Sequence, residues 1–439
     1  MILFFLWATM METGKNNIYA IQINDKRYIL GRRNKAETGT LHIGQFYALD
    51  GSSGASVEMD ATFPHAILIC GKRGYGKSYT MGVLIEEISF LEEEIRNDLS
   101  VIIIDTLGIF WTMAYPNSIT ENNKAIKETF SKGIDISLYV PKKSIECYGD
   151  LQTNVIPFQM KTSDITSEHW CTLFNVKPTD PFGMILTKAV LHLQEETTSY
   201  TIQDIIDTIH KDTSSNDRIN GVAENFFTMA KGWDIFGSHD DILQYLIQPG
   251  KISVLDISHI SNMQVKQVLL HIISEKLFQY RVQVRKKQEK RSMGLINEEH
   301  NEPMIWLAID EAQLFLPVEE NNIAKNVLIE KWLRQGRQPG LSLVMATQRP
   351  SAIDQEVLSH CDIIFCHRLT AQDDILSLQK LRPTYMKGSI EGIMKKIGRE
   401  KGVCLVIDDT MEESHIIKIR PRRSWHGGGE PSAGSTKKP

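Results

Sequence analysis

The stretch Gly71-Lys72-Arg73-Gly74-Tyr75-Gly76-Lys77-Ser78 decides the fold of this chain, since it satisfies the pattern G-x-x-x-x-G-K-[ST]. The apolar run 66–70 before it predicts a buried strand, and residues 79–88 after it predict a helix. A strand, a glycine loop and a helix in this order direct backbone N–H groups and a helix dipole at phosphate oxygens. The alternative is a chance glycine-rich turn. We predict a nucleotide-binding loop formed by Gly71, Arg73, Gly74, Tyr75, Gly76, Lys77, Ser78 and Tyr79.

A second motif supplies carboxylates. The apolar run 304–309 ends in Asp310 and Glu311, as a Walker B strand does. We expect ATP as the substrate, with Lys77 on its β- and γ-phosphates. Ser78 and Asp310 are expected to hold Mg²⁺, and Glu311 to polarise the attacking water. Two solvated acids at a strand end are the alternative.

A third buried run, 341–346, precedes Thr347 and Gln348. An amide at the end of a strand beside the P-loop can hydrogen-bond the γ-phosphate or the lytic water. Gln348 is therefore the candidate sensor. The alternative is a capping side chain in the turn before Pro350.

Composition indicates a soluble globular protein of 439 residues with a formal net charge of −5, enough for two or three domains. This charge gives no global signature of nucleic-acid binding, but phosphate binding is a local property. The six cysteines show no C-x-x-C or zinc-finger spacing, which indicates a reducing compartment. We expect a cytoplasmic protein without a membrane span.

The organisation along the chain predicts an α/β protein with a RecA-like P-loop NTPase core. Its sheet is expected to be mostly parallel, with helices on both faces. The expected parts are a disordered or misannotated start (1–16), a small N-terminal β-barrel (17–60), the core (61–149 and 251–423), a helical insertion (150–250) and a flexible tail (424–439). Met10 or Met11 is the suspected true start, because the preceding apolar run is too short to span a bilayer.

The most basic stretch of the chain is 281–291, which carries six Lys and Arg residues against Glu289 alone. This stretch is interpreted either as a solvated surface segment or as a contact with DNA.

Taken together, these segments resemble the HerA/FtsK superfamily of P-loop motors, and specifically HerA-like ATPases, over about residues 17–427. The resemblance is carried by 42–44, 65–80, 310–317, 334–341, 346–351 and 420–428. Gln313 stands where many relatives have histidine, and Gln338 where lysine is usual. These departures leave the hydrolysis chemistry intact.

The resemblance implies a homohexamer that translocates double-stranded DNA through its central channel. It also implies that the N-terminal barrel docks a partner, either a NurA-like nuclease or a sirtuin- or nuclease-type effector. The two contexts are DNA end processing and anti-phage defence.

A ring also explains how a positive charge can reach the far side of the γ-phosphate. Arg337 is the first candidate for an arginine finger in trans and Arg334 the second, with surface arginines paired to nearby acids as the alternative. Arg422 and Arg423 are further candidates for reaching a neighbouring subunit. Asp105, which ends the strand 101–105, is expected to orient water or the Mg²⁺ shell, or else to cap a helix.

Two other functions remain open. One is a conjugation- or secretion-type DNA-pumping ATPase, which would favour a membrane anchor or a larger N-terminal domain. The other is a regulatory ATP-binding scaffold that assembles an effector without translocating. A small-molecule kinase is a distant third, because Glu311 suits water activation better than acceptor binding.

Overall fold

The computed structural model describes residues 27–32, 38–48, 52–117, 131–151, 153–238, 242–297, 302–381 and 388–429. The expectations for residues 1–16, for a strand near 18–23 and for the last part of the tail lie outside these ranges. No helix among the described residues is long and apolar enough to cross a bilayer.

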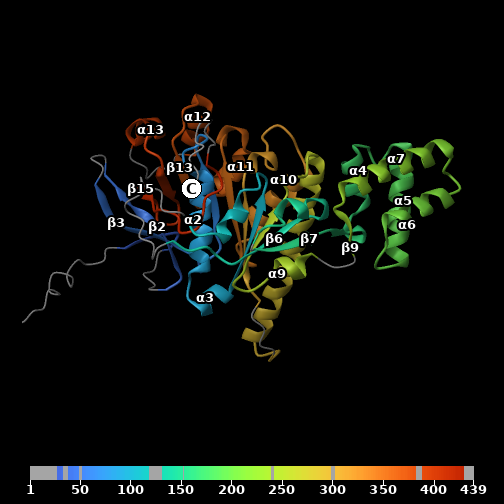
Figure 1. Ribbon diagram of the computed structural model, residues 1–439, viewed down its shortest axis with the longest axis horizontal. Helices are drawn as coiled ribbons and strands as arrows, with labels where there is room; N and C mark the ends of the chain where they lie inside the picture. Colours follow the sequence, from blue (N-terminus) through green and yellow to red (C-terminus); the bar gives the residue numbers. More distant parts are fainter. Residues whose placement is uncertain are drawn as a thin grey trace, which may run out of the picture.

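A thirteen-stranded sheet runs through the described residues in the order β1-β3-β2-β15-β14-β13-β4-β12-β11-β5-β10-β6-β7 (Figure 1). The eight strands from β13 to β7 are all parallel to one another. These eight are β13 (Ile363–His367), β4 (Ala66–Cys70), β12 (Leu341–Thr347), β11 (Met304–Ile309), β5 (Leu99–Asp105), β10 (Ile252–Asp256), β6 (Ile136–Pro141) and β7 (Asn154–Phe158).

The parallel strands from β13 to β10 are buried on both faces, which explains why their sequences are largely apolar. In β4, Leu68 and Cys70 belong to one hydrophobic cluster, while Ile67 and Ile69 belong to the other. The predicted α/β fold, with a mostly parallel sheet and helices on both faces, is therefore confirmed.

Helices from distant parts of the sequence cover the two faces. α2 (Lys77–Ser89) packs into one cluster, and α9 (Met263–Ser292) packs into the other. The remaining helices of the core are α3 (Glu93–Asn97), α8 (Leu243–Leu246), α10 (Ile323–Val327), α11 (Gln355–His360), α12 (Gln372–Lys380) and α13 (Ile390–Ile397), with a π-helical turn at Leu328–Leu333.

The N-terminal strands extend the sheet, and the described residues do not show the predicted barrel. β2 (Thr40–Tyr47) pairs antiparallel with β15 (Glu413–Ile419), which itself pairs with β14 (Val403–Asp408). β3 (Ser53–Asp60) then pairs with β2, and β1 (Tyr28–Leu30) pairs with β3. The backbone groups of β2 are satisfied by β15 on one side and β3 on the other, so these strands continue the sheet instead of closing on themselves.

Buried charges tie these N-terminal strands to the parallel sheet. Asp60, at the end of β3, accepts a hydrogen bond from Arg32 and lies 3.5 Å from Nε2 of His65. His65 Nδ1 is 2.7 Å from the Asp362 carboxylate, just before β13. Burial alone would lower the pKa of His65, but the Asp362 and Asp60 carboxylates outweigh it and raise that pKa to about 9. His65 is therefore an imidazolium at neutral pH.

Four helices form a group at one end of the molecule, drawn in green in Figure 1. They are α4 (Ser167–Phe174), α5 (Pro181–Glu196), α6 (Ile202–Lys211) and α7 (Asp217–Trp233), with the two-stranded pair β8 (Met160–Lys161) and β9 (Phe236–Ser238) beside them. Trp170 is at the centre, with its ring centroid 5.1 Å from that of Phe227. This group lies within the expected insertion 150–250, although β7 belongs to the main sheet.

Candidate nucleotide site

The glycine loop lies between the carboxyl end of β4 and the amino end of α2. Gly71, Gly74 and Gly76 have φ angles of 153°, 80° and 113°, which side chains rarely adopt. A Cβ atom on Gly71 would lie 2.6 Å from Cβ of His367. The glycines of the motif are therefore required by backbone conformation and by the close approach of β13.

Lys77 is buried at the first position of α2, and its Nζ lies 3.5 Å from the carbonyl oxygen of Lys72 in the same loop. Burial lowers the pKa of Lys77, while the nearby Glu311 and Asp310 carboxylates oppose that shift. A largely desolvated ammonium group is thus held inside the phosphate-binding loop.

Ser78 near the start of α2 and Asp310 after β11 are in contact. The Ser78 hydroxyl donates to Oδ2 of Asp310 at 3.2 Å, and Asp310 follows β11. Burial and then the charge of Glu311 raise the pKa of Asp310 to about 6. A hydroxyl beside a carboxylate is an oxygen donor set of the kind Mg²⁺ takes. A divalent cation would also offset the repulsion between the two acids. Ser78 and Asp310 would therefore hold Mg²⁺, whose bound form supplies charge neutralisation at the phosphates.

Glu311 sits at a left-handed backbone position, with a φ angle of 51°, immediately after the Walker B strand. Its carboxylate accepts hydrogen bonds from the side-chain amides of Gln348 and of Gln313, the latter at 2.5 Å. Gln313 in turn accepts from the Thr347 hydroxyl at 2.8 Å. The candidate base and the candidate sensor are therefore joined directly, and Gln313 acts as a bridge to the end of β12.

His367 and Arg368 contact the glycine loop and were not anticipated from the sequence. His367 Nε2 lies 2.9 Å from the Thr80 hydroxyl, and burial lowers the pKa of His367 to about 4. The Arg368 carbonyl accepts the Lys72 N–H at 2.8 Å, and the Arg368 guanidinium lies 5.7 Å from the centre of the Tyr75 ring. Their only sequence signal is their place at the end of the apolar run that forms β13.

Asp105 caps the turn that follows β5. Its carboxylate accepts the backbone N–H groups of Leu107, Gly108 and Phe110 at 2.8 to 3.1 Å. Burial, followed by the charge of Asp256 on β10, raises the pKa of Asp105 to about 7. These contacts match the capping alternative, and the charge of Asp310 also contributes to the raised pKa of Asp105. A role of Asp105 in orienting water or the Mg²⁺ shell stays a prediction.

Arg334 and Arg337 are both exposed on the segment before β12. The Arg334 guanidinium pairs with Glu330 and Glu356 of its own chain, as the surface-arginine alternative describes. The Arg337 guanidinium makes no hydrogen bond or ion pair with any described residue. Of the two, Arg337 is the one whose charge is available to another chain.

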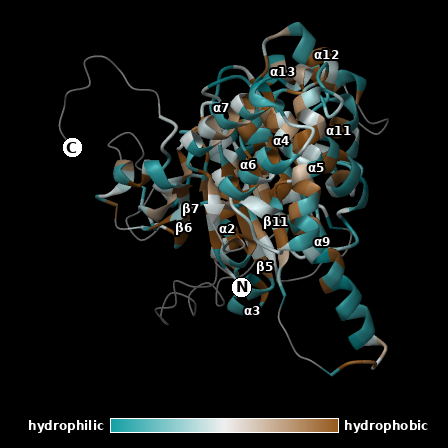
Figure 2. Cartoon of the chain, turned by 90° about the vertical axis from the view of Figure 1, so that its right-hand side faces the viewer, coloured by the Kyte–Doolittle hydropathy of each residue, from teal (hydrophilic) through white to brown (hydrophobic). Residues whose placement is uncertain are grey.

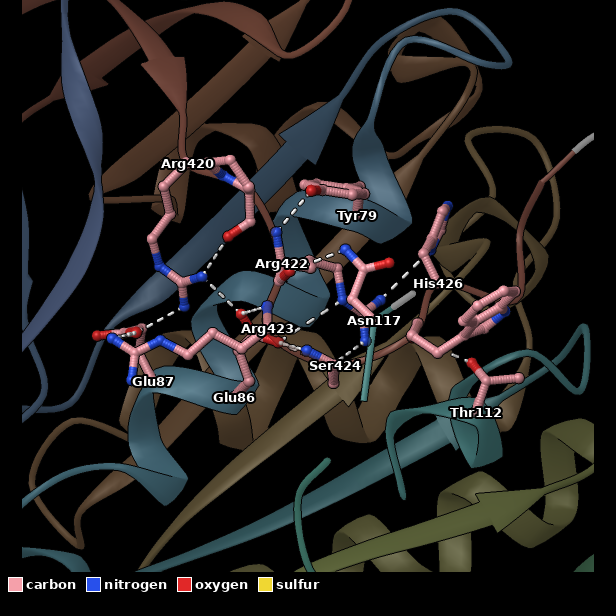
Figure 3. A network of polar contacts seen from close by, with 12 residues as sticks. Tyr79, Glu86, Glu87, Thr112, Asn117, Arg420, Arg422, Arg423, Ser424 and His426 are labelled. Carbon is pink, nitrogen blue, oxygen red and sulfur yellow. Dashed lines mark hydrogen bonds and ion pairs between the residues drawn. The ribbon is translucent and has the colours of Figure 1, made fainter. Parts of the chain in front are cut away.

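The segment 420–427 is bound to the outer face of α2 (Figure 3). Glu86 on α2 is fully buried and accepts the Arg420 guanidinium at 2.6 Å. The same carboxylate accepts the backbone N–H groups of Arg423 and Ser424, each at 3.0 Å, and the Ser424 hydroxyl at 2.7 Å. The segment is thus anchored to the helix that begins at Lys77, at the end of the nucleotide loop.

Arg422 and Arg423 engage their own chain, and a contact with a neighbouring subunit stays a prediction. The Arg422 guanidinium is buried against Gly82, where an added Cβ would lie 2.5 Å from Nη1. The Arg422 N–H donates to the Tyr79 hydroxyl at 2.6 Å, so this Tyr79 group, predicted to bind nucleotide, already has a partner. Arg423 lies over the Phe90 ring, 4.7 Å from its centre.

The fold and these contacts define a P-loop ATPase. Residues 41–276 match the family model described as "Helicase HerA, central domain", and because this match covers more than half of the chain, the chain belongs to the HerA family.

Two curated relatives are similar over part of their length. The DNA double-strand break repair helicase HerA of Pyrococcus furiosus is 25% identical over 189 residues, which cover 39% of this chain and 33% of the relative. The protein of the same name from Sulfurisphaera tokodaii is 21% identical over 186 residues, covering 42% and 35%. The chain thus spans about a third of the length of the curated relatives it matches.

Solved structures share the fold. VirB4 of Thermoanaerobacter pseudethanolicus superposes with a TM-score of 0.54 at 15% identity, covering 88% of this chain and 98% of VirB4. The bacterial conjugative coupling protein TrwB superposes with a TM-score of 0.50 at 12% identity, covering 91% and 92%.

Proposed function

We propose that this ATPase is a homohexameric motor that translocates double-stranded DNA. The observation that carries the proposal is the joined set of Ser78, Asp310, Glu311 and Gln348 beside Lys77. Such a set suits hydrolysis by an activated water, with Lys77 on the phosphates, Glu311 as the base and Gln348 as the group that orients it. The relatives in Pyrococcus and Sulfurisphaera, named as DNA double-strand break repair helicases, support DNA as the polymer along which the motor moves.

The ring is proposed from the position of Arg337. A P-loop site needs a positive charge opposite the phosphate-binding loop, and an exposed guanidinium without a described partner can provide it to the neighbouring subunit. Arg334 is less suitable, because two acids of its own chain already hold it.

The partner is proposed to dock on the N-terminal strands. Tyr28, Phe46 and His415 form a half-exposed ring cluster there, with centroids 4.6 to 5.6 Å apart. Aromatic groups of this kind are favoured contact residues at protein interfaces. A NurA-like nuclease or a sirtuin-type effector is the proposed class, working in DNA end processing or anti-phage defence. The six cysteines are free thiols, in keeping with a cytoplasmic location.

The test is steady-state ATP hydrolysis with and without linear double-stranded DNA, with particle mass measured on the same sample. The proposal expects stimulation by DNA on a particle of six chains, and no turnover in a Lys77→Ala control. Hydrolysis that ignores DNA, with or without the docked partner, would favour the regulatory scaffold instead.

A further inference from the structure

α9 is much longer than the body of the protein requires. At 30 residues it spans about 45 Å, at 1.5 Å per residue. Its first part packs in the core as far as Leu277, and buried Arg281 then fixes it by donating to the carbonyls of Pro339 and Pro303, each at 2.8 Å. Beyond Val284 the helix leaves the body, and both views show this end standing away from it (Figures 1 and 2).

The projecting end, residues 285–292, is strongly cationic and contains no apolar residue. Its cations are Arg285, Lys286, Lys287, Lys290 and Arg291. Among described residues, Arg285 pairs with Glu289 at 3.4 Å and Lys287 with Glu302 at 3.5 Å. This concentration of positive charge stands on a chain with a net charge of −5.

Lys286 and Lys290 are the exposed cations that make no ion pair with a described residue. They are four positions apart, so they lie on one face of α9, one turn from each other. Glu298 and Glu299 follow in the sequence, outside the described residues. The inference is based on Lys286 and Lys290.

We propose that the projecting end of α9 binds the phosphate backbone of double-stranded DNA without reading its sequence. Ammonium groups on flexible stems act as point charges toward phosphates and release counterions from the duplex. The inference rests on the proposed function and adds a second DNA contact to it. This contact lies at the amino ends of the strands, since Arg281 bonds to residues just before β11, whereas the nucleotide residues follow the carboxyl ends.

A lipid surface fits this segment less well. Helices that lie on membranes carry an apolar face along their length. Here the exposed apolar side chains, Met293 and Leu295, come only after the helix has ended.

The experiment measures binding of a fluorescein-labelled linear duplex to the full-length chain by anisotropy, across a range of salt concentrations. The variant is Lys286→Glu with Lys290→Glu. Its control is Lys142→Glu with Lys143→Glu, a second exposed lysine pair, in the 3-10 helix Lys142–Tyr148. Circular dichroism and hydrolysis without DNA confirm that each variant is folded.

The α9 variant is expected to lose at least about tenfold in affinity relative to the control. Its plot of log affinity against log salt should be shallower by about 2, from two lost phosphate contacts. Equal affinity and slope in the two variants would overturn the inference while leaving the proposed function in place. Wild-type protein that binds no duplex would overturn both. Loss of binding to phosphatidylserine vesicles, with duplex binding unchanged, would assign the segment to a lipid surface.

Discussion

The side-chain amide of Gln348 donates a hydrogen bond to the carboxylate of Glu311, so the candidate sensor and the candidate base form one hydrogen-bonded unit. The two residues follow neighbouring parallel strands, β12 and β11, whose pairing brings their carboxyl ends together. A residue that contacts water or phosphate can therefore change the orientation of the base directly.

Glu311→Gln is expected to bind ATP normally and to hydrolyse it about a hundredfold more slowly or worse, the usual loss for a general base. The measurement is ATP affinity by a fluorescent analogue, set beside turnover under saturating ATP. Lys77→Ala is the control, because it should lose binding itself. Wild-type turnover in Glu311→Gln would remove this residue from the base role.

Gln348→Ala should lower turnover while ATP affinity stays near that of the wild type, because the base loses the donor that orients it. The measurement compares turnover under saturating ATP with ATP affinity, each relative to the wild type. Gln355→Ala is a suitable control, since this amide contacts Ser377 away from the nucleotide loop. A change confined to ATP affinity would contradict the orienting role.

Arg337→Ala should abolish hydrolysis in the ring, whereas Arg334→Ala should have little effect, because Arg334 pairs within its own chain. A trans role can be tested by mixing two inactive proteins, Arg337→Ala and Glu311→Gln. At some interfaces an intact base then meets an intact arginine from the next subunit. Recovery of hydrolysis supports the role in trans, and a mixture as inactive as its components rules it out.

Gly82→Ala is expected to destabilise the protein, by about 1–3 kcal/mol as in other overpacked sites. The added methyl group would meet the Arg422 guanidinium, which cannot move without weakening its bond to Ser424 at 2.7 Å. The control is Gly221→Ala in α7, where an added Cβ meets nothing within 4 Å. That change should stabilise its helix by about 0.5–1 kcal/mol. Thermal or denaturant unfolding of both variants checks the difference in sign.

Stability should fall as the pH rises from about 6.5 to about 9, because the pKa of His65 is raised to about 9 in the folded protein. Folding favours the protonated imidazole, so this contribution is complete below pH 6.5 and disappears above the folded pKa. Burial lowers the pKa of His367 to about 4, so the contribution of His367 to the pH dependence of stability is confined to pH values below 6.5. Denaturant unfolding against pH measures the decline, and His65→Gln should flatten it; an equal slope in that variant would contradict the assignment.

Much of the core could be predicted because the signals are local. The glycine loop, the strand 304–309 and the strand 341–346 each carry their own apolar pattern and end residues. Continuously apolar strands of this kind are typical of a parallel sheet, in which the carboxyl ends of the strands lie at the same edge. The side chains at their carboxyl ends were therefore expected to converge, and Ser78, Asp310, Glu311 and Gln348 do so.

Other features depend on contacts between distant residues. His367 and Arg368 reach the nucleotide loop only because β13 pairs beside β4, and no local pattern specifies that pairing. Gly82 leaves a space on α2 that the guanidinium of Arg422 fills, although the two residues are 340 positions apart in the sequence. The N-terminal strands join β15 because its edge satisfies their backbone groups. The sequence by itself determined the chemistry of the loop and the strand ends, since these follow from short patterns. Only the tertiary structure decided which distant charges and strand edges became neighbours, because that choice depends on the packing of the whole chain.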